Sequence, residues 1–255
     1  MSDLLKYLCK RGGSSGAGSR RAAAPQQQAT PSGVTYDQFM QMSADERYDL
    51  INTVLNNPNI KVPRELDNSE TSKVMYALGM NNKPKVVSES VLDTLPGVVN
   101  YRTVADAFNP PPYSRDILKQ IKTDDFTQLS GSGGSLHGRA LYFANNYFQS
   151  TLYGHGQSSV VMRMKINSSA NIVTEQTLLK QMKADKSFMK KTKKVSSEDR
   201  ISMYALSHGV DGWNDPSTGY TMLLNRGAMT VSSANKWVYD RNGGAFFDWA
   251  SAPNA

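Results

Sequence analysis

The side chains that most often carry out catalysis are scarce in this sequence. Each of the three histidines, His137, His155 and His208, precedes a glycine, which indicates turns, and no carboxylate is fixed beside any of them. A structural role therefore suits them better than a role as general base. Cys9 is the single cysteine, so neither an internal disulfide nor a Cys/His zinc cluster can form, and we expect no metal. The chain also lacks the P-loop, the Rossmann glycines, HExxH and GxSxG.

Three aromatic residues and one arginine are the more informative group. The stretch from Gly138 to Ala144 contains Tyr142 and Phe143, and Tyr153 follows eleven residues after Tyr142. Upstream, Arg102 stands between Tyr101 and Thr103. A planar guanidinium donates two charge-assisted hydrogen bonds at once to a phosphate group, and aromatic rings stack on flat ligands. The simpler alternative is a surface arginine with ordinary core aromatics.

Together these stretches resemble the NAD-binding segments of the ADP-ribosyltransferase superfamily, in its poly-ADP-ribose polymerase branch and its phage or toxin members. The resemblance covers roughly residues 98–233. It implies that NAD is the substrate, that Arg102 contacts its ribose or phosphate, and that Tyr142 and Tyr153 sandwich the nicotinamide ring. Arg139-Ala140 replaces the second glycine of the family pattern. The NAD-binding residues implied by the resemblance are Arg102, Thr103, Gly138, Tyr142, Phe143, Ala144 and Tyr153.

Residues 209–213 and 220–227 resemble the turn and the closing strand of the same family. There the family places a catalytic glutamate, which stabilises the cationic transition state, and this sequence has Thr221. The catalytic residues implied by the resemblance are thus Arg102, Tyr142 and Thr221. Because a threonine hydroxyl carries no charge, we expect any transfer to be slow and to add single units. Asp211 and Asp215 are the nearest other acids.

Three functions remain open on the sequence. The first is an NAD-dependent mono-ADP-ribosyltransferase that modifies a host or partner macromolecule, with a protein or nucleic-acid acceptor. The second is a catalytically inactive NAD- or ADP-ribose-binding protein, or a structural component of a phage particle. The third is nucleic-acid binding through the lysines of 180–194, although aromatic residues of the kind that single-strand binders use are not interleaved there. We expect a location in a cytoplasm, including delivery into a host cell by a virion.

Composition limits the architecture around these residues. The 255 residues carry a net charge of +7, and no run of about 18 apolar residues is present, so we expect no membrane span. The excess positive charge is concentrated in residues 1–33 and 180–200. Residues 10–33 are mostly Gly, Ser, Ala, Gln and Pro, which bury too little to offset the entropy of ordering. We therefore expect 1–33 to be a basic disordered tail.

The elements that must position the site are predicted from periodicity and capping. Ser43 and Glu46 have capping-box spacing before apolar residues at helical intervals, and Gly79 is placed to end a later helix. Helices are expected at 44–55, 69–78, 88–95, 178–194 and 198–207, and strands at 98–104, 159–166, 171–174, 220–224 and 228–232. Helices in 34–97 followed by a β-rich core in 98–255 predict an α+β fold. The resemblance implies a split antiparallel β-sandwich of ADP-ribosyltransferase type.

Overall fold

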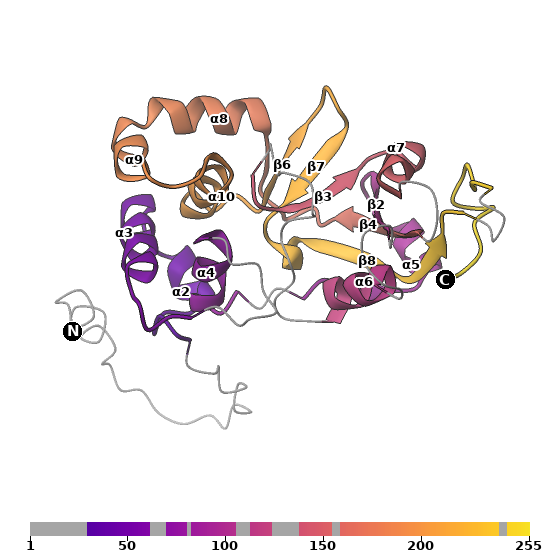
Figure 1. Ribbon diagram of the computed structural model, residues 1–255, viewed down its shortest axis with the longest axis horizontal. Coiled ribbons are helices and arrows are strands. Elements are labelled where there is room, and N and C mark those ends of the chain that lie inside the picture. Colours follow the sequence, from indigo (N-terminus) through magenta and orange to yellow (C-terminus); the bar gives the residue numbers. More distant parts are fainter. Residues whose placement is uncertain are drawn as a thin grey trace, which may run out of the picture.

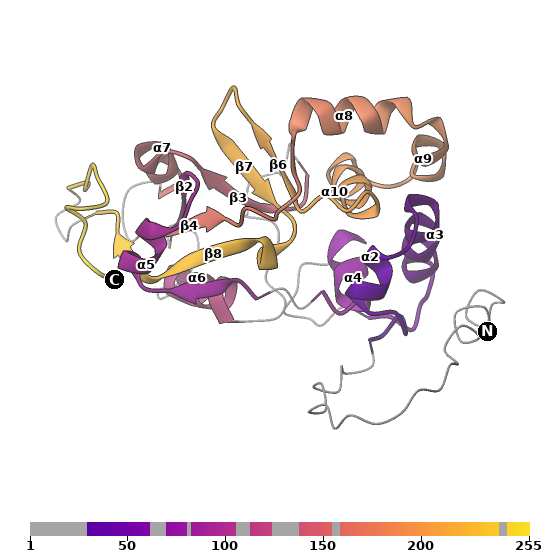
Figure 2. The same cartoon turned by 180° about the vertical axis from the view of Figure 1, so that it is seen from behind.

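The computed structural model describes residues 30–61, 70–80, 83–105, 113–123, 138–154, 159–239 and 244–255. His137, His155 and most of the expected N-terminal tail lie outside these residues. Within the described part, the chain forms a mixed α/β structure with nine α-helices and one eight-stranded sheet (Figure 1). Helices α2 to α4 and α8 to α10 gather at one end, and the sheet extends from them toward the C-terminus (Figure 2).

The helices and short 3-10 turns are α2 (Tyr36–Met40), α3 (Ala44–Leu55), α4 (Glu70–Ala77), α5 (Glu89–Thr94), α6 (Tyr113–Thr123), α7 (Tyr147–Thr151), η1 (Leu152–Gly154), α8 (Glu175–Ala184), α9 (Lys186–Lys191), α10 (Ser197–Ser207) and η2 (Arg226–Ala228). The strands are β1 (Lys85–Val87), β2 (Val99–Ala105), β3 (Leu141–Ala144), β4 (Ser159–Ile166), β5 (Ile172–Thr174), β6 (Gly212–Asp215), β7 (Tyr220–Leu223) and β8 (Met229–Trp237). None of the described helices is long and apolar enough to cross a membrane.

Local capping signals account for the start and end of the N-terminal helices. Ser43 Oγ accepts a hydrogen bond from the Glu46 amide at 3.3 Å, and Glu46 Oε2 accepts one from the Ser43 amide at 2.8 Å, so the predicted capping box at α3 is confirmed. After α4, Gly79 adopts φ +59°, the left-handed conformation that closes a helix. Ser32 donates its amide hydrogen to the carbonyl of Ala77, at 3.0 Å, so contacts with the helices begin before the expected boundary at Val34.

Two expected elements differ from the structure. The expected basic helix over 178–194 is interrupted at Asp185, where ψ is 87° and the carboxylate accepts the Phe188 amide at 2.9 Å to begin α9. A side chain that caps a new helix ends the preceding one at that point. The strand expected at 228–232 continues to Trp237 as β8, because the whole of β4 is available as a partner.

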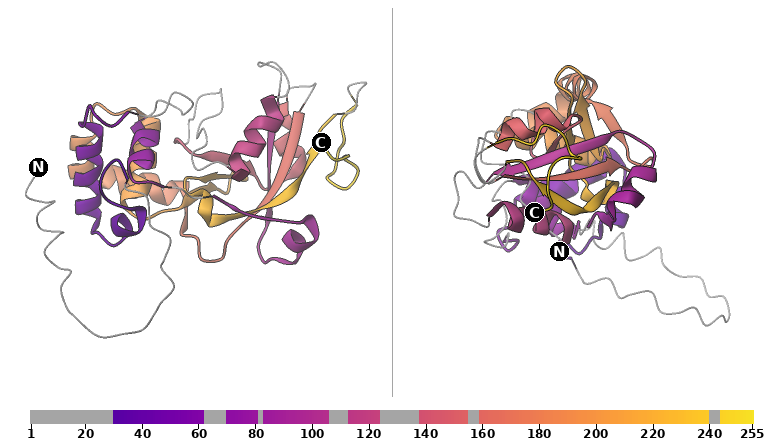
Figure 3. Two further views of the ribbon diagram at one scale, coloured as in Figure 1. Left: turned by 90° about the horizontal axis from the view of Figure 1, so that it is seen from below. Right: turned by 90° about the vertical axis from the view of Figure 1, so that its right-hand side faces the viewer.

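The strand order is β1-β8-β4-β2-β3-β7-β6-β5. The interior pairs are antiparallel, as expected, but the two edge pairs, β1 with β8 and β5 with β6, are parallel, so the sheet is mixed. Only one residue pair, Tyr101 with Ala144, joins β2 to β3. The sheet therefore consists of two four-stranded halves, which meet at a fork between β2 and β3. Figure 3 shows the molecule from two further directions.

Separate apolar cores lie on the two faces of the β3–β7–β6 half. One core contains Phe143, Leu223 and Met162, and it fills the inner side of the fork, between the two halves of the sheet. The other contains Trp213 and Met222, and it joins the opposite face to the helices α3, α4, α8 and α10. Side chains alternate between the two faces of a strand, so successive residues of β3 and of β7 face the two cores in turn.

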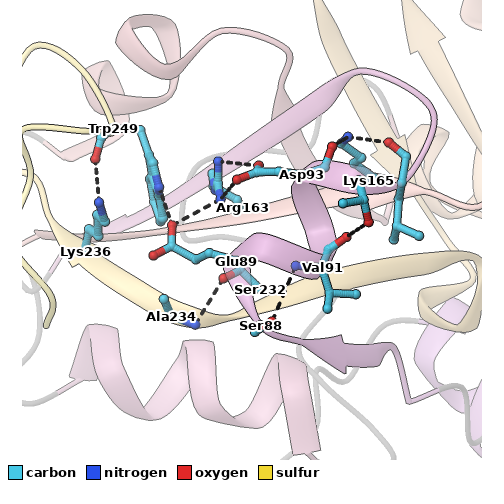
Figure 4. A network of polar contacts seen from close by, with 12 residues as sticks. Ser88, Glu89, Val91, Asp93, Arg163, Lys165, Ser232, Ala234, Lys236 and Trp249 are labelled. Atoms are coloured by element: carbon cyan, nitrogen blue, oxygen red, sulfur yellow. Dashed lines mark hydrogen bonds and ion pairs between the residues drawn. The ribbon is translucent and has the colours of Figure 1, made fainter.

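The C-terminal segment, residues 244–255, packs through Trp249 on the outer face of the β1–β8–β4–β2 half (Figure 4). Its ring lies between Arg163 Cζ, 4.7 Å from the ring centroid, and Lys236 Nζ, 4.9 Å away. Its Nε1 donates to Glu89 Oε1 at 2.5 Å. Arg163 is buried and forms ion pairs with Glu89, at 3.1 Å, and with Asp93, at 3.0 Å. A buried guanidinium requires such partners, so this network is structural.

Candidate functional site

The fork between β2 and β3 positions Arg102. The strands separate beyond the Tyr101–Ala144 pair, and a backbone carbonyl at such a point needs a side-chain partner or water. Arg102 Nη1 donates to the carbonyl oxygen of Tyr142 at 2.9 Å. The arginine therefore lies at the fork, in contact with the strand that carries the predicted aromatic motif.

Gly138 sets the turn that leads into β3. Its φ is +101°, and a Cβ there would lie 2.8 Å from Trp213 Cζ2 and 3.1 Å from Ile201 Cγ2, so only glycine fits. The carbonyl of Gly138 accepts a hydrogen bond from the Tyr142 hydroxyl at 2.8 Å. The next residue, Arg139, exchanges backbone hydrogen bonds with Ser202 Oγ of α10, at 2.7 and 2.9 Å. The motif is thus held against α10 despite its departure from the family glycine pattern.

The side chains of α7 and η1 reach both halves of the sheet. Thr103 Oγ1 of β2 and Ser150 Oγ of α7 lie 2.6 Å apart and are buried. Gln149 donates through its side chain to the carbonyl of Thr218, and the Asn145 amide donates to the carbonyl of Gly219 at 3.0 Å. α7 is thereby fixed both to β2 and to the β6–β7 turn.

This fixed position brings Tyr153, from η1, against β7. The rings of Tyr153 and Tyr220 pack edge to face with centroids 5.8 Å apart. Burial, together with the hydrogen bond to Tyr220, raises the pKa of Tyr153 above its ordinary value, although 49% of the residue is exposed. On β3, Tyr142 stands opposite Met222 and Ala144 opposite Tyr220, so Tyr142 and Tyr220 emerge on the same side of the sheet. We call the surface formed by Tyr142, Tyr153 and Tyr220 the tyrosine face.

The residues expected to form one site are divided between two faces. Thr103, Ala144 and the tyrosines lie on the side that α7 covers, and Gly138 is in the turn before it. Phe143 and Thr221 are paired in register on the inner side of the fork. Thr221 is 7% exposed, and its hydroxyl lies 3.5 Å from Asn100 Oδ1. Arg102 is two residues from Asn100 on β2 and shares that inner side, with its guanidinium reaching β3.

Tyr220 is the residue of this face that the sequence analysis missed. It directly precedes Thr221, and side chains that follow each other in a strand point to opposite faces. The alternation along the strand shows that the side chains of Tyr220 and Thr221 lie on opposite faces of the sheet. Only the pairing of β7 with β3 shows that Tyr220 lies on the same face as Tyr142.

The two nearby acids have different positions. Asp211 accepts hydrogen bonds from the Asn171 amide at 2.8 Å and from Asn225 Nδ2 at 2.6 Å, so it holds the turn before β6. Asp215 stands opposite Tyr220 in register and therefore on the tyrosine face. Its two carboxylate oxygens accept the hydroxyls of Ser217 and Thr218, each at 2.7 Å, which stabilises the β6–β7 turn.

His208 lies apart from these residues, at the C-terminal cap of α10. Its ring stacks on Tyr204 with centroids 4.0 Å apart, and Nδ1 is 2.9 Å from the Tyr204 carbonyl oxygen. Within the described ranges, no group of three or more His, Cys, Asp or Glu side chains is arranged to hold a metal ion.

The half-exposed ring of Tyr153 and the partly buried rings of Tyr142 and Tyr220, which also pack against the helical core, offer aromatic surface to a flat ligand, and a guanidinium lies at the adjacent fork and a carboxylate beside Tyr220. Comparisons of this chain with protein-family models, with curated proteins and with solved structures give no match, so its functional assignment depends on these residues.

Proposed function

We propose that this chain is an NAD-dependent mono-ADP-ribosyltransferase that binds the nicotinamide end of NAD on the tyrosine face. The observation that carries the proposal is the arrangement of the aromatic motif: Tyr142 emerges on the same side of the sheet as Tyr220, and η1 packs Tyr153 against Tyr220. The division of the sheet at a single β2–β3 residue pair also supports it, because the resemblance implies a split sheet.

Each group has a role in this proposal that follows from its chemistry. Stacking on tyrosine rings holds the nicotinamide and excludes water from the bond that breaks. Arg102, at the fork, is placed to donate to the pyrophosphate while it remains bound to the Tyr142 carbonyl, since a guanidinium has five N–H donors. Nicotinamide leaves with the electron pair of its bond to ribose, and the acceptor group bonds to the same ribose carbon and loses a proton.

The proposed site provides little stabilisation for the positive charge of the transition state. A positive charge develops on the ribose as the bond breaks, and a fixed carboxylate stabilises it best. Thr221 carries no charge and belongs to the inner side of the fork, and the carboxylate oxygens of Asp215 already accept hydroxyl groups. We therefore propose slow transfer of single ADP-ribose units.

These same observations favour a second function, the binding of NAD or ADP-ribose without transfer, which includes a structural role in a phage particle. In that case the tyrosine face is a recognition surface and the missing carboxylate has no consequence. Incubation with labelled NAD and a cell lysate separates the two, because only a transferase labels macromolecules.

Calorimetry with NAD tests the proposed site. The double variant Tyr142→Ala/Tyr153→Ala removes both stacking surfaces, each worth about 1 to 3 kcal/mol, so NAD affinity should fall by at least about 30-fold. Phe247→Ala is the matched control, because Phe247 is an aromatic residue that is 73% exposed and lies in the C-terminal segment. Unchanged affinity in a folded double variant would show that NAD does not bind at the tyrosine face.

A further inference from the structure

A dense group of lysines lies on the outer side of α8 and α9. Residues 180–194 contain seven lysines, all exposed, and a single acidic residue, Asp185. Asp185 is half-buried, and its carboxylate accepts a hydrogen bond from the Phe188 amide at 2.9 Å, so it is the N-cap residue of α9. The exposed lysines are Lys180, Lys183, Lys186, Lys190, Lys191, Lys193 and Lys194.

Six of these lysines form no ion pair with another described residue. Lys191 is the exception: its Nζ is 3.5 Å from Asp49 Oδ1 and 4.7 Å from the ring centroid of Tyr48. We call the other six the lysine surface. The six charges outnumber the single acidic residue of 180–194, Asp185, so they add to a positive potential at this end of the molecule.

The core presents the lysine surface in a fixed geometry. On α8, Leu178 and Met182 are buried, and with about 100° of rotation per residue Lys180 and Lys183 point away from them. On α9, Phe188 is buried between Tyr48 and Tyr204, with ring centroids 5.3 and 4.9 Å away.

Lys186 and Lys190 lie two residues on either side of Phe188 and point outward. Figure 1 and Figure 2 both show the two helices at the outer margin of the helical end of the molecule. The packing of α8 and α9 therefore leaves Lys180, Lys183, Lys186 and Lys190 pointing to solvent.

The chemistry of this surface suits one class of partner. A membrane-binding helix exposes apolar residues beside its lysines, whereas Leu178, Met182 and Phe188 are all buried in the core. A single-strand binder uses aromatic side chains between its cations, and the exposed positions of 180–194 carry only Lys, Gln, Ser and Ala. Six exposed ammonium groups within residues 180–194, without ion pairs to other described residues and without stacking rings, match the phosphates of a duplex, which carries one charge per about 1.7 Å of axis.

We propose that the lysine surface binds the phosphate backbone of double-stranded nucleic acid, without reading its sequence. Phosphate contacts by lysine carry no base information, so affinity depends on charge and on salt. If all six lysines release a condensed counterion, the slope of log K against log salt reaches about −5. This binding does not involve NAD and is independent of the function proposed for the tyrosine face.

Fluorescence anisotropy with the full chain and a labelled DNA duplex of arbitrary sequence tests the proposal. The variant Lys183→Gln/Lys186→Gln/Lys190→Gln should lower the association constant by up to about 500-fold at about 0.1 M salt and reduce the salt slope by about 3. The matched control Lys61→Gln/Lys85→Gln/Lys119→Gln removes the same charge from three exposed lysines elsewhere, and it should retain most of the affinity and the slope.

Equal losses in the two variants would overturn the proposal, because binding would then follow net charge alone. Absence of duplex binding by the wild-type chain at about 0.05 M salt would overturn it as well. Polyglutamate or anionic vesicles bound as tightly as the duplex would show that the partner belongs to another class. A duplex bound in the absence of NAD, with the predicted loss in the first variant only, supports the proposal whatever the outcome at the tyrosine face.

Discussion

Thr221→Glu should strongly destabilise the fold, whereas Tyr220→Glu should raise NAD consumption at a small cost in stability, although the two residues are neighbours on β7. Thr221 is 7% exposed, and it is paired with Phe143 on the inner side of the fork. Tyr220 is half-buried and emerges on the tyrosine face beside Tyr153. A glutamate at 221 enters an apolar core, whereas a glutamate at 220 reaches the surface on which we propose that NAD binds.

The cost at position 221 follows from the pKa of a buried carboxyl group. Burial on the inner side of the fork disfavours the charged form of the new side chain, so it takes up a proton on folding and its pKa rises in the folded state. At pH 7 the cost is about 1.4 kcal/mol for each unit between 7 and the unfolded pKa near 4.3, which is about 4 kcal/mol. Because the folded pKa is raised, the penalty is absent below about pH 4 and grows as pH rises, and it is about 1 kcal/mol at pH 5.

Urea denaturation of the variants at pH 5 and at pH 7 measures this difference. Thr221→Gln is the control, because glutamine has the size of glutamate without its charge, so its deficit should not change with pH. Tyr220→Glu should cost about 1 kcal/mol, mainly the lost ring contact with Tyr153, and it should raise NAD consumption above the wild-type rate. If Thr221→Glu were as stable as Thr221→Gln at pH 7 and accelerated NAD consumption, the division of the two residues between faces would be wrong.

Two further predictions concern the framework of the site. Gly138→Ala should destabilise the chain by about 2 to 4 kcal/mol in chemical denaturation, because the residue has φ +101° and the new methyl group lies 2.8 Å from Trp213. The control Gly33→Ala, at φ +72° with no atom within 4 Å, should cost only about 1 kcal/mol. Equal costs in the two variants would contradict the packing argument. Burial raises the pKa of Tyr147 to about 12, so its contribution to stability is lost as pH rises from 10 toward 12. The buried Tyr147 hydroxyl has no hydrogen-bond partner in the described structure, so Tyr147→Phe should leave the melting temperature at pH 7 unchanged and reduce the loss above pH 10. A marked drop in the melting temperature of Tyr147→Phe at pH 7 would contradict this, because it would show that the Tyr147 hydroxyl forms a stabilising hydrogen bond.

Local sequence information was sufficient for the elements whose causes are local. The capping box at Ser43 and Glu46 satisfies backbone groups within four residues, so α3 could be predicted to within a residue. The alternation in 159–166 likewise predicted β4. The break at Asp185 was missed because an aspartate inside an otherwise helical pattern gives only a weak stop signal.

The sequence by itself determined α3, α4, α5 and α10, the strands β2, β4, β5, β7 and most of β8, and the concentration of lysines in 180–194, but it did not indicate α2, α6 or α7. The tertiary structure alone decided the parallel edges of the sheet, since β1 and β8 are more than 140 residues apart and nothing local specifies their pairing. It also decided that Tyr220, rather than Thr221, accompanies Tyr142. The physical reason is the period of two along a strand: a shift of one residue in the register of β7 against β3 exchanges the two faces, and that register is set by which side chains the two cores bury.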